Sequence, residues 1–148
     1  MILREGLLAG VEATVTGAPA VAARFETLGA ALVESEPAVL VLAGAPEPLA
    51  ALDGAWETIR AHALPHMTER GGQILLLAPA PGDAHAQAAR GGLENLARTL
   101  SVEWSRFGVR PVTILPGART SDAELAELAA FLASPAGQYY SGCAFTLV

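Results

Sequence analysis

Three short, continuous apolar runs constrain the fold of this chain more than any other feature. They occupy residues 38–43, 73–78 and 109–115, and a helical pattern follows each of the first two. A strand buried on both faces has an unbroken apolar run, whereas a strand with one wet face alternates. Apolar strands separated by helices predict a parallel sheet covered by helices on both sides.

The segments between these runs have the periodicity of helices with one apolar face. In residues 49–69, apolar side chains recur every three or four positions, at Leu49, Leu52, Trp56, Ile59 and Ala63. We expect Pro65 to kink or end this helix. Residues 85–107 repeat the spacing with Leu93, Leu96, Leu100 and Trp104, and Gly108 is placed to terminate the helix.

The ends of the chain complete the predicted order. A third helix should begin after Ser121 or Asp122 as N-cap and stop before Ser134-Pro135, and residues 143–147 should form the last strand. Residues 11–17 alternate like a strand, and residues 20–33 resemble a helix that ends near Gly29. We therefore predict one α/β domain over residues 1–148, a three-layer αβα sandwich whose ligands would bind beyond the carboxyl ends of the strands.

Charge and composition exclude several classes of partner. The net charge is −6 with only 9 Lys and Arg among 148 residues, which argues against binding nucleic acid or anionic membranes. No apolar run is long enough to span a bilayer, and the first residues lack the pattern of a secretory signal, so we predict a cytoplasmic protein. Cys143 is the only cysteine and is interpreted as a small apolar residue rather than a nucleophile. Only 16% of the residues are charged, which favours apolar surface that a partner subunit covers.

Several motifs in order resemble those of the short-chain dehydrogenase/reductase family over about residues 38–148. Val-Leu-Ala-Gly at 41–44 stands where the family has Asn-Asn-Ala-Gly, and residues 72–79 stand where it has Gly-x-Ile-Val-Asn-Ile-Ser-Ser. The long helix, Pro116-Gly117, and the ending Leu132-Ala-Ser-Pro with Tyr140-Ser-Gly142 follow in the family's order. The resemblance implies a Rossmann-like parallel sheet and descent from NAD(P)-dependent oxidoreductases.

The family's catalytic residues are replaced. In the family, a Tyr transfers a proton, a Lys four residues later stabilises the phenolate, and a Ser polarises the carbonyl of the substrate. These positions are Ala86, Arg90 and Pro79 (or Ala78) in this chain. Alanine carries no proton, and a permanently charged arginine cannot replace a phenol, so we expect no catalytic residues.

The phosphate loop and the substrate lid of the family are also altered. The glycine-rich fingerprint is reduced to Thr16, Gly17 and a few small residues, with Pro19 removing a donor, so we expect no bound cofactor. About 37 residues precede the first apolar run, roughly half of what the family uses, which predicts a reduced sheet lacking two edge strands. Few residues separate Gly117 from the next helix, which leaves no room for a lid.

The helices that the family uses for assembly remain, and they suggest association. We therefore predict a catalytically inactive protein that forms homo-oligomers or pairs with an active short-chain dehydrogenase. The expected interface consists of Trp56, Leu93, Leu96, Leu100, Trp104, Tyr139 and Tyr140. One alternative is an NAD(P)-dependent oxidoreductase in which His85 or Arg90 has an altered role, and another is a protein that binds a small apolar ligand at the ends of the strands.

Four polar residues have both a functional and a structural interpretation. His62 and His66 have the spacing of metal ligands, but Pro65 lies between them, and we predict no metal site. A surface or interface salt bridge is the expected role of Arg90 rather than anion binding. Thr120 is predicted to stabilise a turn.

Overall fold

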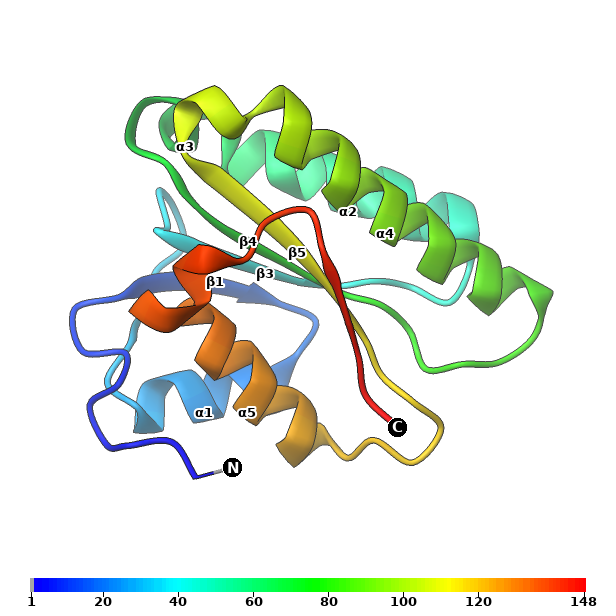
Figure 1. Cartoon of the computed structure of the whole chain (residues 1–148), viewed down its shortest axis with the longest axis horizontal. Coiled ribbons are helices and arrows are strands. Elements are labelled where there is room, and N and C mark those ends of the chain that lie inside the picture. Colours follow the sequence, from blue (N-terminus) through cyan, green and yellow to red (C-terminus); the bar gives the residue numbers. More distant parts are fainter. Residues whose placement is uncertain (1) are drawn as a thin grey trace.

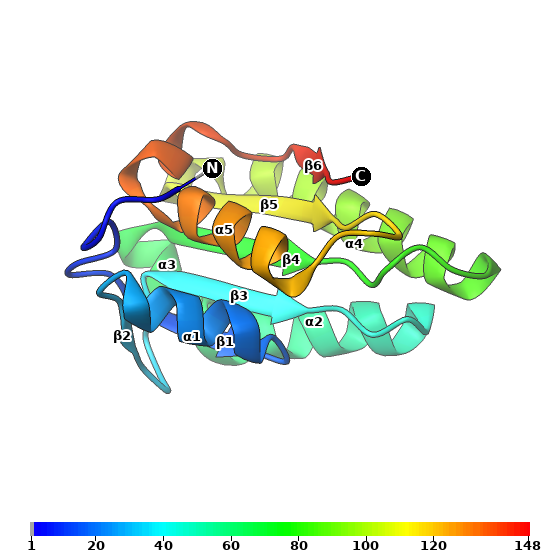
Figure 2. The same ribbon diagram turned by 90° about the horizontal axis from the view of Figure 1, so that it is seen from below.

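The computed structural model describes residues 2–148 as a six-stranded, wholly parallel sheet between two layers of helices (Figures 1 and 2). The strands have the spatial order β2-β1-β3-β4-β5-β6. Their bounds are β1 Glu12–Thr16, β2 Ala31–Leu32, β3 Val39–Ala43, β4 Gly72–Leu77, β5 Val109–Leu115 and β6 Ala144–Thr146. The helices are α1 Pro19–Thr27, α2 Pro48–His62, α3 Leu64–Arg70, α4 Ala84–Glu103 and α5 Asp122–Ala133, with short 3₁₀ turns η1 Ser105–Phe107 and η2 Pro135–Tyr139.

The continuous apolar runs are explained by a core on each side of the sheet. In β3, Val39 and Val41 belong to the core on the α1 and α5 side, whereas Leu40 and Leu42 belong to the core on the α2, α3 and α4 side. Successive side chains of a strand point to opposite faces, so a sheet covered on both faces needs apolar residues at every position. The predicted three-layer architecture is confirmed.

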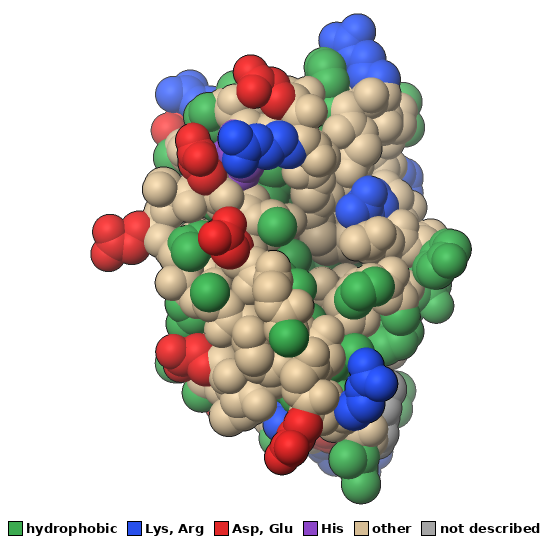
Figure 3. All heavy atoms as spheres, turned by 90° about the vertical axis from the view of Figure 1, so that its left-hand side faces the viewer, with side chains coloured by type: hydrophobic (Ala, Val, Ile, Leu, Met, Phe, Trp, Pro, Cys, Tyr) green, Lys and Arg blue, Asp and Glu red, His purple; other side chains and the backbone are tan. Residues whose placement is uncertain are grey.

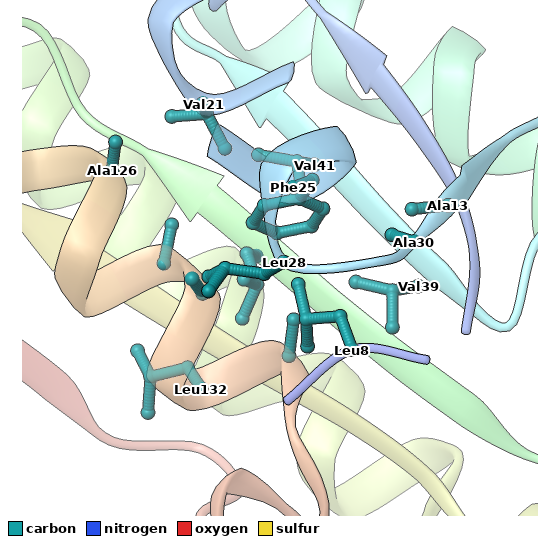
Figure 4. Packing of buried hydrophobic residues seen from close by; sticks show 14 of the residues in the cluster. Leu8, Ala13, Val21, Phe25, Leu28, Ala30, Val39, Val41, Ala126 and Leu132 are labelled. Carbon is teal, nitrogen blue, oxygen red and sulfur yellow. The ribbon is translucent and has the colours of Figure 1, made fainter. Parts of the chain in front are cut away.

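Helix α1 and the residue after it pack on the sheet through two large side chains. Phe25 of α1 and Leu28, which follows the end of α1, are fully buried and lie near Val41 of β3 and Leu132 of α5 (Figure 4). Leu8, from the segment before β1, closes the same cluster. An ion pair between Arg24 of α1 and Glu127 of α5 joins the two helices at their outer surface.

Proline, glycine and serine set the helix boundaries largely as predicted. Helix α2 ends at His62 and α3 begins at Leu64, so Pro65 lies in the first turn of a new helix. Gly108 has a φ of +73°, which is the left-handed conformation expected of a terminating residue. Ser121 caps α5 through a capping box with Glu124. The backbone and hydroxyl of Ser121 donate to the Glu124 carboxylate and hold its pKa below the ordinary value.

The prediction for the first edge of the sheet was partly wrong. We expected a helix over residues 20–33 and the loss of two edge strands, but α1 ends at Thr27 and Ala31–Leu32 forms β2 beside β1. Gly29, with a φ of +97°, turns the chain after α1. The classic order 3-2-1-4-5-6 of doubly wound sheets also has six strands, and relative to it this sheet lacks the strand beyond β2 and has one more strand, β6, at the opposite edge.

The face at the amino-terminal ends of the strands carries charged side chains of both signs. Figure 3 shows acidic and basic side chains on this face, with hydrophobic groups between them. Within residues 2–148, no helix is long and apolar enough to cross a membrane.

Candidate functional site

A crevice opens where the carboxyl ends of β1, β3 and β4 meet. Strand β1 continues into α1 on one face of the sheet, and β3 continues into α2 on the other face (Figure 2). A reversal of this kind is the usual ligand position in open α/β sheets. The larger cavity, of about 320 Å³, lies among residues 17–21, Ala43 and Gly44, residues 77–79, and Asp122 with Leu125.

A second cavity, of about 150 Å³, lies on the α2 side of the same strand ends. Ala43 and Gly44 line both cavities, so the two cavities lie on either side of the end of β3. Helix α2 contributes Gly54 and Thr58 to the smaller cavity, and β1 contributes Thr16. Sequence analysis predicted the edge of the sheet at which the crevice lies but not the contribution of α2. The local sequence signal for this contribution is Gly54, a glycine inside a helical pattern.

The residues of the crevice do not fit the pyrophosphate of a dinucleotide. Helix α1 begins at Pro19, only two residues after Gly17, and Ala18 at its N-cap makes no side-chain hydrogen bond to the helix. The larger cavity is lined by one ionisable side chain, the carboxylate of Asp122, and neither cavity has a lysine or arginine. A phosphate placed here would approach a carboxylate without a neutralising cation, which is unfavourable.

Arg90 has a structural role that differs from both roles considered from the sequence, which were anion binding and a salt bridge. Its Nη1 donates to the carbonyl oxygen of Pro79 at 2.6 Å and to that of Pro116 at 2.8 Å. Arg90 forms no ion pair within residues 2–148, so the predicted surface salt bridge is not found there, and a salt bridge across an interface stays a prediction. The side chain joins the segments that follow β4 and β5, because one guanidinium can donate to two acceptors at once.

The other two positions of the family's catalytic trio also have no reactive group at the crevice. Ala86 is 5% exposed in the first turn of α4, and its N–H donates to Oδ1 of the capping Asp83 at 3.0 Å. Pro79 offers a carbonyl oxygen that Arg90 already occupies. Within the described chain, none of these three positions has a side chain that gives up a proton near neutral pH.

Replacement of Arg90 by alanine is expected to lower the free energy of unfolding by about 2 kcal/mol, because two partly buried hydrogen bonds from a charged donor are lost. Urea denaturation followed by circular dichroism measures this change. The control is Arg98→Ala, which removes only an exposed i,i+4 pair with Glu94 and should cost about 0.5 kcal/mol or less. Equal losses in both variants would contradict the proposed tie between the strand ends.

The histidines do not gather into a site. His66 is buried, and its Nε2 lies 2.8 Å from the carbonyl oxygen of Pro37, while His62 lines a separate hollow beside β1. Within residues 2–148, no three His, Cys, Asp or Glu side chains are close enough to hold a metal ion. His85 is exposed with Nδ1 3.9 Å from Glu47 and lines neither crevice cavity. Thr120 accepts from the Gly117 N–H at 2.8 Å, so its predicted turn role is confirmed.

The residues predicted for an interface divide into two groups. Leu93, Leu100 and Trp104 are 1%, 5% and 9% exposed and belong to the core on the α2 and α4 side, so the chain itself covers them and their assignment was wrong. Leu96 is half-buried against that core. Three aromatic residues remain accessible to a partner, namely Trp56, Tyr139 and Tyr140.

Two aliphatic residues on the helices are exposed, and the cysteine is half-buried. Leu49 was expected to face inward but is 71% exposed at the start of α2. Val102, near the end of α4, is 73% exposed and was not singled out from the sequence. Cys143 is half-buried and packs against the α1 and α5 core, in agreement with its interpretation as a small apolar residue.

The strand order, the two helix layers and the crevice define a Rossmann-like, doubly wound α/β protein. The same fold occurs in the citronellol catabolism dehydrogenase AtuB of Pseudomonas aeruginosa PAO1, with a TM-score of 0.70 and 24% identity over 99% of this chain and 96% of that one. It also occurs in a hydroxysteroid dehydrogenase from Escherichia coli, with a TM-score of 0.73 and 19% identity over 96% of this chain and 97% of that one.

Sequence comparison finds a relative that matches part of the chain. The chain is 34% identical to a probable 2,4-dienoyl-CoA reductase of Bacillus subtilis strain 168, over 45% of this chain and 37% of that protein. It thus spans well under half the length of this curated relative. No family model matches the chain. The resemblance to the short-chain dehydrogenase/reductase family is confirmed in sequence and in fold.

Proposed function

We propose that this chain is a catalytically silent relative of the short-chain dehydrogenases that associates with a second copy or with an active family member. The observation that supports the proposal most is the pair of hydrogen bonds that Arg90 donates to backbone carbonyls. At the position of the family's lysine, its guanidinium holds two backbone carbonyls instead of facing a phenolate. Ala86, at the position of the family's tyrosine, is buried and has no hydroxyl to exchange a proton with a substrate.

The alternative of an active enzyme with altered residues has less support. A general acid or base must come within hydrogen-bonding reach of the reacting atom. His85 points toward Glu47 on the surface, and the only ionisable group at the larger cavity is Asp122. Asp122 is the first residue of α5, and a carboxylate there stabilises the helix through the helix dipole. This structural role explains the presence of Asp122 without a catalytic one.

Association is supported by exposed apolar side chains on the α2 and α4 layer. Leu49 and Val102 expose most of their surface, and Trp56 is 39% exposed while its ring lies 6.4 Å from that of the buried Trp104. Exposed tryptophan and aliphatic side chains are typical of protein interfaces. The outer faces of α2 and α4 are therefore the proposed contact.

The first test is a titration with NADH and NADPH followed by calorimetry. We expect no binding tighter than about 1 mM, because the crevice lacks a cation and α1 begins without a glycine-rich loop. A micromolar dissociation constant for either cofactor would favour the active-enzyme alternative and contradict the silent one.

The second arm measures association by sedimentation velocity, alone and with active short-chain dehydrogenases. A dimer or a mixed complex is expected at micromolar concentration, and Trp56→Glu should dissociate it because it places a charge in the contact. Thr68→Glu on α3, half-buried and outside the proposed contact, serves as the control. A monomer in every mixture would refute the partner role without bearing on catalysis.

A further inference from the structure

Three arginines come from adjacent segments at the amino-terminal ends of β4 and β5. Arg70 is the last residue of α3, Arg106 lies in η1, and Arg110 is the second residue of β5. The backbone brings these segments together, because a Cβ on Gly71 would lie 2.9 Å from the carbonyl oxygen of Gly108. The three arginines therefore belong to one face of the molecule, and we name them the arginine surface.

The arginine surface has no counterions of its own. In the part of the chain that the structure describes, none of its three members forms an ion pair, although the chain has 15 acidic residues. Even Glu69, next to Arg70, and Glu103, at the end of α4, form no ion pair with them. Three other arginines are paired with glutamates, namely Arg24, Arg60 and Arg98. Unpaired like charges on one face favour an anionic ligand.

Two of the three guanidinium groups are already held in place. Arg110 donates from Nε to Gln73 Oε1 at 3.4 Å and from Nη1 to the Gly108 carbonyl oxygen at 3.1 Å, and its Nη2 has no acceptor within residues 2–148. Gln73 is 3% exposed, and its Nε2 also has no partner there. The guanidinium of Arg106 lies 4.6 Å from the ring centre of Phe107, and this stacking leaves its N–H edge free. Ordered donors lose little freedom when a ligand binds.

The surroundings of these donors suit a short protein segment. Arg70 and Arg106 are exposed and Arg110 is half-buried, so the surface is open, whereas sites for small molecules are concave. Figure 3 shows hydrophobic groups between the charged side chains on this face, which fits contact with another protein. The net charge of −6 repels a long polyanion, but attraction to a few carboxylates acts over only about 8 Å at physiological salt.

We propose that the arginine surface binds a short acidic segment of a partner protein, with carboxylates accepting from the free N–H groups of the three guanidiniums. Arginine clusters commonly recognise acidic motifs, because the planar fork matches a carboxylate. The proposal goes beyond the proposed function, since it concerns the end of the α2, α3 and α4 layer and not the outer faces of α2 and α4.

The test is fluorescence anisotropy with a hexaglutamate peptide that carries an uncharged fluorescent label. We expect the peptide to bind with a dissociation constant below about 100 μM at low salt, and about tenfold more weakly when the salt concentration is raised tenfold. Hexaglutamine and hexalysine peptides should not bind. An octathymidylate should bind more weakly than hexaglutamate, because its longer row of charges meets the repulsion of the whole chain.

The double variant Arg70→Gln with Arg106→Gln should weaken hexaglutamate binding about tenfold, and adding Arg110→Gln should weaken it further. The double variant changes only exposed side chains, so it should keep the stability of the unmodified protein, and thermal unfolding checks this. Arg119→Gln is the matched control, because Arg119 is also without an ion pair but lies between β5 and α5, at the opposite ends of the strands. It should change binding less than about twofold.

Absence of hexaglutamate binding, equal weakening by the double variant and by Arg119→Gln, or tighter binding of the octathymidylate would each overturn the proposal. These outcomes are distinguishable from failure of the proposed function. Calorimetry with NADH and sedimentation of the chain alone do not involve the arginine surface. The double variant should therefore sediment as the unmodified protein does.

Discussion

Replacement of Phe25 by alanine is expected to lower the free energy of unfolding by about 3–5 kcal/mol, because the fully buried ring is lost and a cavity remains. Phe25 fills the space between α1, the sheet and α5, where Leu28, Val41 and Leu132 also meet (Figure 4). No neighbouring side chain is free to fill this space, since those around it are themselves buried. Domains of this size have a total stability of about 5–15 kcal/mol, so the variant should be close to unfolding.

Urea denaturation at 25 °C, followed by circular dichroism, measures the effect on Phe25→Ala. Leu49→Ala is the control, because Leu49 is 71% exposed and its truncation should change stability by less than about 0.5 kcal/mol. Similar midpoints for the two variants would contradict the position assigned to α1 in the core.

The second large effect is expected at Trp104. Replacement by glutamate should lower the free energy of unfolding by more than about 3 kcal/mol, because it removes a ring packed against α2 and places a carboxylate at a site only 9% exposed. Trp56→Glu introduces the same charge at a neighbouring but half-exposed ring and should cost about 1 kcal/mol or less.

Comparison of the Trp104→Glu and Trp56→Glu variants distinguishes an effect on stability from an effect on association. Thermal unfolding should distinguish Trp104→Glu from Trp56→Glu by a large margin, while only Trp56→Glu should change sedimentation without unfolding the chain. A folded, dissociated Trp104→Glu variant would restore the interface role that the sequence first suggested for this residue.

The fold was predictable because its main determinants are local in the sequence. Apolar runs such as 38–43 are typical of strands buried on both faces, and Pro65, Gly108 and Ser121 mark helix boundaries through their own chemistry. Strand β2 escaped detection because two residues carry no periodicity, and Ala31 and Leu32 are common in helices.

Helical periodicity identifies a buried face but not the element that buries it, and this explains the interface residues that were assigned wrongly. The spacing of Leu93, Leu100 and Trp104 correctly identifies one buried face of α4. It does not say whether the sheet, α2 or a second subunit buries that face. In this chain, Gly92 lets α2 approach closely, since a Cβ there would lie 3.0 Å from Leu52, and the two helices cover each other.

The candidate site was predictable in place but not in composition. The carboxyl ends of parallel strands identify the location. The contacts of Arg90 reach Pro79 and Pro116, which are 11 and 26 positions away, and no local pattern contains such distances. Gly54 and Thr58 reach the crevice only because α2 crosses the end of β3.

The contacts of Arg90 with the segments after β4 and β5 also bear on which residues positions 86 and 90 could accept. Both hydrogen bonds leave from Nη1, and a lysine ammonium also has N–H donors for two carbonyls, so the number of donors does not exclude lysine at position 90. A tyrosine at position 86 would have to displace the surroundings of a side chain that is now 5% exposed. Placing the family's tyrosine here would therefore require the packing around position 86 to change, and not the side chain alone.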